Sequence, residues 1–319
     1  MSGSLSIGSS LEFAGTSVDN ATCDDVGGEN SLVDVDDVKH GLSKADASPS
    51  SRSRVVVFDI DDTLCKSDFI GIRAGEKALK IAIKNHPECP FIFSDEWEDR
   101  SFMRKLHVFL PYLQIVFDYL LQQGVRIVFF SCSMKKRNVS VIPELLISFW
   151  GREKFEALKA KGQFEIFSAE HVRPCTTFQD EGTCVKDLKV VIRGDETLSD
   201  AILVEGVISF AAYDQKPVLN IIELKEWCLS DNYRHIPLSR AGKSNNFPLN
   251  SVYYMFGVFR TYFENEKFKV LPLREGLRQI LPEDACSLIS FFLKHSFAND
   301  MIELGLSEVQ KVVPDAIYY

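Results

Sequence analysis

Two aspartates at the end of an apolar run are the residues best placed to do chemistry. The run Val55–Phe58 is β-branched and aromatic, which is typical of a buried strand, and it continues into Asp59-Ile60-Asp61-Asp62-Thr63. Because Asp59 and Asp61 lie two residues apart just past a strand, both carboxylates can face one pocket. One can attack phosphorus to give an aspartyl-phosphate, and the other can protonate the departing oxygen and later activate water. A hard cation such as Mg²⁺ would relieve the repulsion between carboxylate and phosphate.

These residues resemble motif I of the haloacid dehalogenase (HAD) superfamily, in which Asp-x-Asp-x-Thr follows a hydrophobic strand. The resemblance implies that Asp59 is the nucleophile and Asp61 the acid/base. It also implies that the main-chain carbonyl of Asp61 helps to bind Mg²⁺ and that Thr63 supports the turn. Members that are ATP-driven pumps carry Thr at the second acidic position, and the dehalogenases also lack that Asp, so Asp61 favours a phosphatase. The alternative is a pair of solvated acids at a turn.

Two further segments follow in the order of the superfamily motifs. Ser131 ends the second apolar run, as in motif II, and its hydroxyl can bind a phosphate oxygen without adding negative charge. Residues 194–200 match motif IV, whose acids complete the Mg²⁺ site. Asp195 is the predicted metal ligand, with Asp200 as its partner and Glu196 as a substitute. The alternative for Glu196 is an acidic helix N-terminus, which the helix dipole favours.

The phosphate-binding lysine of motif III is predicted at Lys186. The segment Val185-Lys186-Asp187-Leu188 resembles one branch of the superfamily, the small phosphatases that act on the RNA polymerase carboxy-terminal tail. Residues 131–136 and 175–186 also resemble that branch. Only eight residues separate Lys186 from Asp195, fewer than the branch usually has. Lys186 then needs its long side chain and a favourable loop to reach the phosphate, and Lys189 remains the alternative.

Alternating strands and helices are expected to position these residues. Continuous apolar strands separated by helices predict an α/β fold with a doubly wound parallel sheet covered on both faces. In such a sheet the functional residues lie at the carboxyl ends of the strands. The predicted strands are Val55–Phe58, Val125–Phe130, Phe164–Phe167, Val190–Ile192 and Val207–Ala211, and the predicted helices cover 72–85, 101–123 and 143–161.

The chain is predicted to have three parts. Residues 1–53 read as a disordered tail, because residues 1–50 hold nine acidic and two basic residues and few that could form a core. Residues 54–228 form the HAD-like core, with an insert at about 65–105 that reads as one helix and a loop. Residues 229–319 form a helical C-terminal region, with apolar residues at helical spacing from Leu249 to Phe263 and further helices at 274–281, 284–295 and 299–313.

Composition excludes several classes of protein. The chain has 319 residues, 45% of them apolar, and a net charge of −9, so it has no basic excess that would indicate nucleic-acid binding. No apolar run approaches the ~20 residues that span a bilayer. The N-terminus lacks the pattern of a secretory signal. The eight cysteines form no CxxC pair, as expected for reduced thiols in the cytoplasm.

A small insert would leave the site open, which suits a phosphorylated side chain on another protein. Aromatic residues of the insert could stack on a phenyl ring and slightly favour phosphotyrosine over phosphoserine; these are Phe69, Phe91, Phe93 and Trp97. Packing of the insert onto the core is an equally good explanation for them. A small phosphomonoester is the first rival substrate, with the C-terminal helices as a lid.

The second rival is a binding module whose C-terminal region docks to a membrane or a partner. The residues that suggest it mix aromatic and basic side chains, as an interfacial helix would: Tyr253, Tyr254, Phe256, Phe259, Arg260, Lys267 and Lys269. Their apolar members follow a core-facing period, which favours ordinary packing. The oligomeric state stays open.

Overall fold

The computed structural model divides the chain into two units, residues 1–46 and 47–319. The residues it describes all belong to the second unit: 53–61, 63–70, 87–98, 101–174, 184–206, 210–212, 215, 218–220, 248–282 and 288–318. The predicted tail, apart from Ser53, and the predicted helix 72–85 lie outside the described residues.

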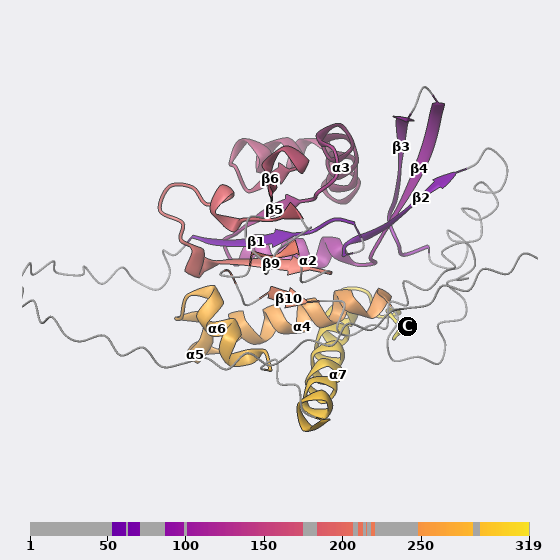
Figure 1. Ribbon diagram of the computed structural model, residues 1–319. Coiled ribbons are helices and arrows are strands. Elements are labelled where there is room, and N and C mark those ends of the chain that lie inside the picture. The colour runs from indigo at the N-terminus through magenta and orange to yellow at the C-terminus, as the bar shows by residue number, and fades with distance from the viewer. Residues whose placement is uncertain are drawn as a thin grey trace, which may run out of the picture. The chain divides into compact units, whose positions relative to one another are not determined.

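A five-stranded parallel sheet forms the centre of this unit, in the order β10-β9-β1-β5-β6 (Figure 1). The strands are β1 (Arg54–Phe58), β5 (Val125–Phe130), β6 (Phe164–Phe167), β9 (Ala201–Glu205) and β10 (Val218–Asn220). From β1 the chain builds outward to β5 and β6, and it then returns to β9 and β10 on the other side of β1. The sheet is therefore doubly wound, which confirms the predicted fold class, and its topological switch point lies between β1 and β9.

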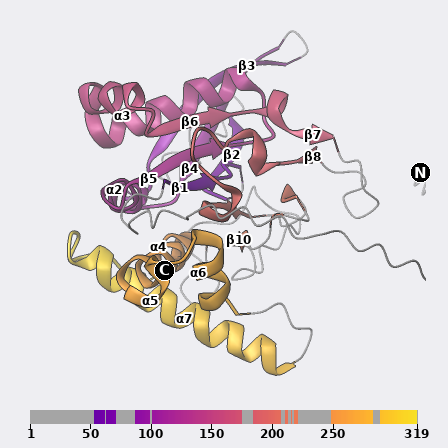
Figure 2. The same cartoon turned by 90° about the vertical axis from the view of Figure 1, so that its left-hand side faces the viewer.

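The two faces of the sheet are covered differently. Even-numbered residues of β1 contact a large apolar cluster that includes the helices α2 (Leu113–Gln122), α3 (Lys135–Ala160) and α4 (Ser251–Glu264). Odd-numbered residues contact a smaller cluster with residues 188–198, because successive side chains of a strand point to opposite faces. Figure 2 shows α2, α3 and α4 together on one side of the strands. Both faces are thus covered, one by long helices and the other by short 3₁₀ turns.

The described residues of the insert after β1 form a three-stranded antiparallel sheet, with a strand where the sequence predicts a loop around Phe91, Phe93 and Trp97, while the predicted helix 72–85 lies outside the described residues. The order of this sheet is β2 (Cys65–Ile70), β4 (Ser101–Phe109), β3 (Phe91–Glu98), and it extends beyond the carboxyl end of β1 (Figure 1). The helix predicted from residue 101 begins only at Leu113. Pro111 marks the boundary, since proline fixes φ and donates no hydrogen bond. Pairing of β4 with strands on both sides decides its conformation.

The predicted strand Val190–Ile192 is wrong. Leu188–Val190 is a 3₁₀ helix (η4), and Val191 is buried against the sheet. The strand that pairs with β1 is β9, with Val57 opposite Leu203. Residues 207–209 of the predicted strand Val207–Ala211 lie outside the described part of the chain; of its described residues, Phe210 lies in a 3₁₀ turn and Ala211 forms an isolated bridge with Lys186. A short apolar run does not by itself distinguish a strand from a buried turn.

The C-terminal region is helical, as predicted. After α4 come α5 (Glu266–Lys269), α6 (Leu273–Ile280) and α7 (Leu288–Gln310), so a single helix replaces the predicted pair 284–295 and 299–313. Helices α4 and α7 cross closely at Gly257 and Gly305. A Cβ at Gly305 would lie 1.9 Å from the carbonyl oxygen of Tyr253, which makes glycine necessary at this crossing.

The aromatic residues of α4 are part of the core. Tyr253, Phe256 and Phe259 are buried, and the ring of Phe259 packs edge-on against Phe58 of β1. These side chains pack inside the unit and do not form an exposed interfacial face. In the described part of the chain, none of the helices has the length and apolar character needed to cross a membrane.

Candidate active site

Asp59 lies immediately past the carboxyl end of β1, where the sequence predicts the nucleophile. Its backbone N–H donates to the carbonyl of Val204, which continues the pairing of β1 with β9. Its Oδ2 accepts a hydrogen bond from the hydroxyl of Thr63 at 2.7 Å. The same hydroxyl accepts from the N–H of Gly206 at 2.7 Å. Thr63 therefore fixes the turn after β1 to the end of β9, the supporting role that the sequence resemblance implies.

Lys186 reaches this carboxylate from the short strand β8 (Cys184–Val185). Its Nζ donates to Oδ1 of Asp59 and to Oε2 of Glu205, at 2.5 Å in both cases. Burial favours the neutral amine, but the two carboxylates outweigh burial and raise the pKa of Lys186 above its ordinary value. Burial likewise raises the pKa of Asp59, and the Lys186 ammonium opposes that rise.

The position of Lys186 is set by its backbone. Its N–H donates to the carbonyl of Phe210 at 2.8 Å, and the residue forms an isolated bridge with Ala211. The neighbouring Asp187 accepts from the N–H of Lys189, whose own side chain is exposed. The structure thus brings Lys186, and not Lys189, to Asp59.

Asp61 is held by a cluster of donors from the end of β5 and the first turn of α3. Ser131 and Ser133 donate to its Oδ2 at 2.9 and 2.8 Å. The guanidinium of Arg137 donates to both carboxylate oxygens. Burial opposes ionisation, but these hydrogen bonds and the charge of Arg137 outweigh it and lower the pKa of Asp61 to about 2. Asp61 is therefore ionised at neutral pH.

Ser131 is at the carboxyl end of β5 and is buried, in the position that the sequence predicts for a phosphate ligand. Its Oγ accepts from the N–H of Ser133 at 3.0 Å and from Arg137 at 3.0 Å while it donates to Asp61. The side-chain amide of Asn138 donates hydrogen bonds to the carbonyl of Ser133 and to the hydroxyl of Ser168, which links the turn to the segment after β6. The backbone between β5 and α3 is thus held rigidly around the carboxylate.

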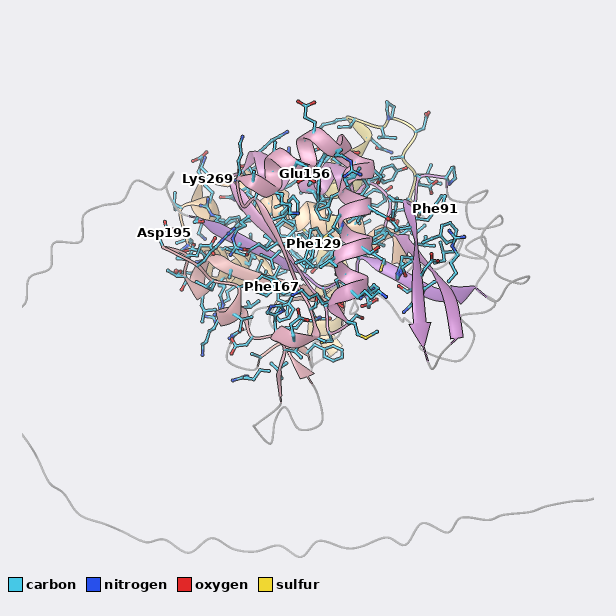
Figure 3. The ribbon with its side chains drawn as sticks, turned by 90° about the horizontal axis from the view of Figure 1, so that it is seen from above. Phe91, Phe129, Glu156, Phe167, Asp195 and Lys269 are labelled. Atoms are coloured by element: carbon cyan, nitrogen blue, oxygen red, sulfur yellow. The ribbon has the colours of Figure 1, made fainter. Side chains whose placement is uncertain are left out.

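The predicted motif IV residues do not lie at this edge of the sheet. Asp195 is exposed, and its neighbour Glu196 bonds to Arg126 at 2.7 Å. Arg126 is the second residue of β5, so this segment lies at the amino ends of the strands. Figure 3 shows Asp195 on the side of Lys269, opposite Phe91 of the insert. Asp200 accepts from Thr197 just before β9 begins. The prediction failed because it rested on a strand at Val190–Ile192 that does not form.

Two site residues were missed from the sequence. Glu205 ends β9, next to Asp59, and Arg137 lies on α3 beside Asp61. A signal for Glu205 exists, because Ala201–Glu205 is an apolar run that ends in an acid. The short spacing between Lys186 and Asp195 was a second signal, since Glu205 follows Lys186 by 19 positions. For Arg137 we find no comparable signal, since one basic residue at a helix start carries no specific information.

The carboxylates beside Lys186 are the groups that could hold Mg²⁺. Among the described residues, no group of three or more His, Cys, Asp and Glu side chains could hold a metal ion. Mg²⁺ usually keeps several waters and takes only one or two carboxylates together with substrate phosphate. Asp59 and Glu205 supply two carboxylates from neighbouring strand ends, and both contact one ammonium. Two carboxylate donors are within the number that Mg²⁺ takes from a protein, so these residues fit the ion.

The aromatic residues of the insert differ in how exposed their rings are. Phe91 is exposed and packs edge-on against Phe93, and Arg104 stacks on the ring of Phe93 at 4.7 Å. The side chains of Phe69 and Trp97 lie outside the described part of the chain. Of the two side chains of the predicted set that the structure describes, Phe91 is the exposed one.

Comparisons with known proteins find similar solved structures. No protein-family model matches the chain, and no curated protein does. Two solved structures of the RNA polymerase II CTD phosphatase Fcp1 are similar. The fission yeast protein bound to beryllium fluoride is 12% identical, with 85% of this chain and 68% of that chain covered and a TM-score of 0.35. A second Fcp1 structure is 9% identical with the same coverage and a TM-score of 0.36. A likeness at these values is too weak to support a function.

Proposed function

We propose that this chain is a phosphomonoester hydrolase in which Asp59 is the nucleophile. The observation that carries the proposal is the ion pair of Asp59 with Lys186 at the switch point of the parallel sheet. Ligands of open parallel sheets bind at such points. A buried lysine beside the carboxylate favours the ionised form of the nucleophile and offsets the charge of an approaching phosphate.

The reaction has two steps. A carboxylate oxygen of Asp59 forms a bond to phosphorus while the bond to the leaving oxygen breaks, and that oxygen departs with its electron pair and takes up a proton from solvent. Water then attacks the aspartyl-phosphate and loses a proton to Asp61. The bond between phosphorus and the Asp59 oxygen breaks, inorganic phosphate leaves, and Asp61 returns its proton to solvent. The ionised state of Asp61 suits its role as the base of the second step.

The proposed cofactor is Mg²⁺. The carboxylates of Asp59 and Glu205 would hold it, together with the main-chain carbonyl of Asp61. When bound, the ion would neutralise charge on the phosphate. Removal of divalent ions with EDTA is expected to abolish turnover, and excess Mg²⁺ is expected to restore it.

The proposed substrate is a phosphorylated protein or peptide, with phosphotyrosine slightly favoured. Two observations support an open site over a lid made of C-terminal helices. Arg54, at the amino end of β1, donates to the carbonyl of Lys269, so α5 lies away from the carboxyl ends of the strands. The insert presents Phe91 as an exposed aromatic ring on the other side. Rates on phosphotyrosine and phosphoserine peptides, compared with a panel of sugar phosphates, test this assignment.

Asp59→Asn is the decisive variant for the enzyme class. It keeps the size of the side chain and removes the nucleophile, so turnover of an aryl phosphate should be lost while the circular dichroism spectrum stays unchanged. Asp195→Asn is the matched control, because Asp195 is an exposed aspartate at the opposite end of the strands. The control should retain the wild-type rate within a few-fold. Wild-type turnover by Asp59→Asn would exclude Asp59 as the nucleophile.

A further inference from the structure

The donors around Asp61 have the composition of an oxyanion receptor. Two N–H groups of Arg137 and the hydroxyls of Ser131 and Ser133 all converge on one carboxylate. The planar fork of a guanidinium matches the oxygens of carboxylates and phosphates equally well. Asp61 therefore occupies a place that the oxygens of a phosphate group could also occupy.

Arg137 is buried and Asp61 is partly exposed, as is required if another anion is to replace Asp61 on Arg137. The side chain of Arg137 is 4% exposed and remains charged at any accessible pH, so it needs an anionic partner. The side chain of Asp61 is 33% exposed and is part of the turn after β1. The receptor is thus fixed on β5 and α3, while its occupant is reachable from solvent.

We propose that Arg137 is a phosphate-binding residue and that Asp61 is the internal occupant of its site. When the substrate binds, its phosphoryl oxygens take over the hydrogen bonds of Arg137, and Asp61 is displaced toward the leaving group and the attacking water. No covalent step is added to the proposed reaction. The inference deepens the proposed function, but it concerns phosphate binding, which can be measured without turnover.

A purely structural ion pair makes different predictions for the same variants. If Arg137 only braces Asp61, loss of either partner should leave the affinity for phosphate nearly unchanged or weaken it. If Asp61 competes with phosphate for Arg137, the two variants must act in opposite directions. Arg137→Met should weaken binding and Asp61→Asn should strengthen it. A hydrogen bond to a charged group is commonly worth about 10- to 100-fold in affinity.

The test is a double-mutant cycle on the full chain with inorganic phosphate as the probe. The wild type, Arg137→Met, Asp61→Asn and the double variant are titrated by calorimetry at constant ionic strength, with and without Mg²⁺. We expect binding to be at least 10-fold tighter in Asp61→Asn than in the wild type. This gain should disappear in the Arg137→Met background. Arg137→Lys, which keeps the charge but loses the fork, should give an intermediate affinity.

The cycle separates competition from general charge repulsion. If Asp61→Asn tightens phosphate binding equally with and without Arg137, the effect is only the loss of a negative charge and the proposal is wrong. Unchanged binding in Arg137→Met and Arg137→Lys would overturn it as well, as would absence of binding in Asp61→Asn. If Arg137→Met does not fold, Arg137→Lys replaces it in the cycle. Asp59→Asn, tested for turnover, reports separately on the proposed reaction.

Discussion

Lys186 and Glu205 form a buried ion pair at the centre of the candidate site. The Nζ–Oε2 distance is 2.5 Å, and each side chain is 1% exposed. The pair joins the segment after β8 to the end of β9, and the same ammonium contacts Asp59. Two carboxylates from adjacent parallel strands thus share one cation, which explains how two acids can lie side by side in a buried place.

Replacement of Glu205 by Gln should weaken Mg²⁺ binding. The amide keeps the shape of the side chain but removes one of two carboxylates that we assign to the ion. We expect the Mg²⁺ concentration for half-maximal turnover to rise at least 10-fold. Calorimetric titration of the substrate-free chain with Mg²⁺ should show the same direction, which separates a metal effect from a catalytic one. An unchanged Mg²⁺ requirement in both measurements would remove Glu205 from the metal site.

Lys186→Met should lower both stability and activity. The variant leaves Asp59 and Glu205 buried without their cation, and loss of one partner from a buried ion pair costs about 3–5 kcal/mol. Protonation of either acid is then favoured in the folded state, so the deficit should shrink as the pH falls toward about 4. Urea unfolding at pH 7 and pH 5 measures this. Lys189→Met is the matched control, since its side chain is exposed, and it should behave as the wild type.

His107 gives the insert sheet a dependence on pH. The ring is buried between the hydroxyls of Ser67 and Ser94, at 2.7 and 2.8 Å. Burial, helped by the charges of Arg137 and Lys105 and opposed by Asp61, lowers the pKa of His107 to about 4. Below about pH 6.5 His107 therefore binds a proton in the unfolded chain but stays neutral in the folded chain until the pH nears 4. Stability is therefore lost as the pH falls from about 6.5 to about 4.

The loss due to His107 should amount to at most about 3 kcal/mol. His107→Gln can still bond to both serines but does not titrate. The difference in unfolding free energy between this variant and the wild type, measured by urea titration from pH 7.5 to 4.5, isolates the histidine. A constant difference across that range would show that the ring is not the titrating group.

Gly305→Ala should destabilise the crossing of α4 and α7. In an open helix the change would stabilise by about 1 kcal/mol, because alanine is the better helix former. Here the new Cβ would lie 1.9 Å from the carbonyl oxygen of Tyr253, a backbone atom that cannot move alone. Overpacking of this kind commonly costs about 1–3 kcal/mol.

Thermal unfolding of Gly305→Ala beside Ser307→Ala checks this packing effect. Ser307 is exposed two residues further along the same helix, so its replacement should be neutral or mildly stabilising. A melting temperature for Gly305→Ala equal to or above that of the wild type would show that the helices can separate without cost.

The sequence alone determined the local parts of the site. The β-branched and aromatic residues of the runs before Asp59 and Ser131 favour buried strands. Both side chains were therefore expected at the carboxyl ends of parallel strands, and the structure brings them to one edge. The resemblance of residues 185–188 to motif III favoured Lys186 and left Lys189 as the alternative, and the backbone bridge of Lys186 to Ala211 places it beside Asp59.

Tertiary structure alone decided which apolar run pairs with β1. Val190–Ile192 and Ala201–Glu205 are both short and apolar, and the free energy that separates a strand from a buried turn comes from partners distant in sequence. The same cause made strands of residues 65–70, 91–98 and 101–109, because β4 is stabilised by neighbours on both sides. For this reason Glu205, and not the predicted Asp195, lies beside Asp59. The clamp of Arg137 on Asp61 joins residues 76 positions apart, and only the packed chain brings them together.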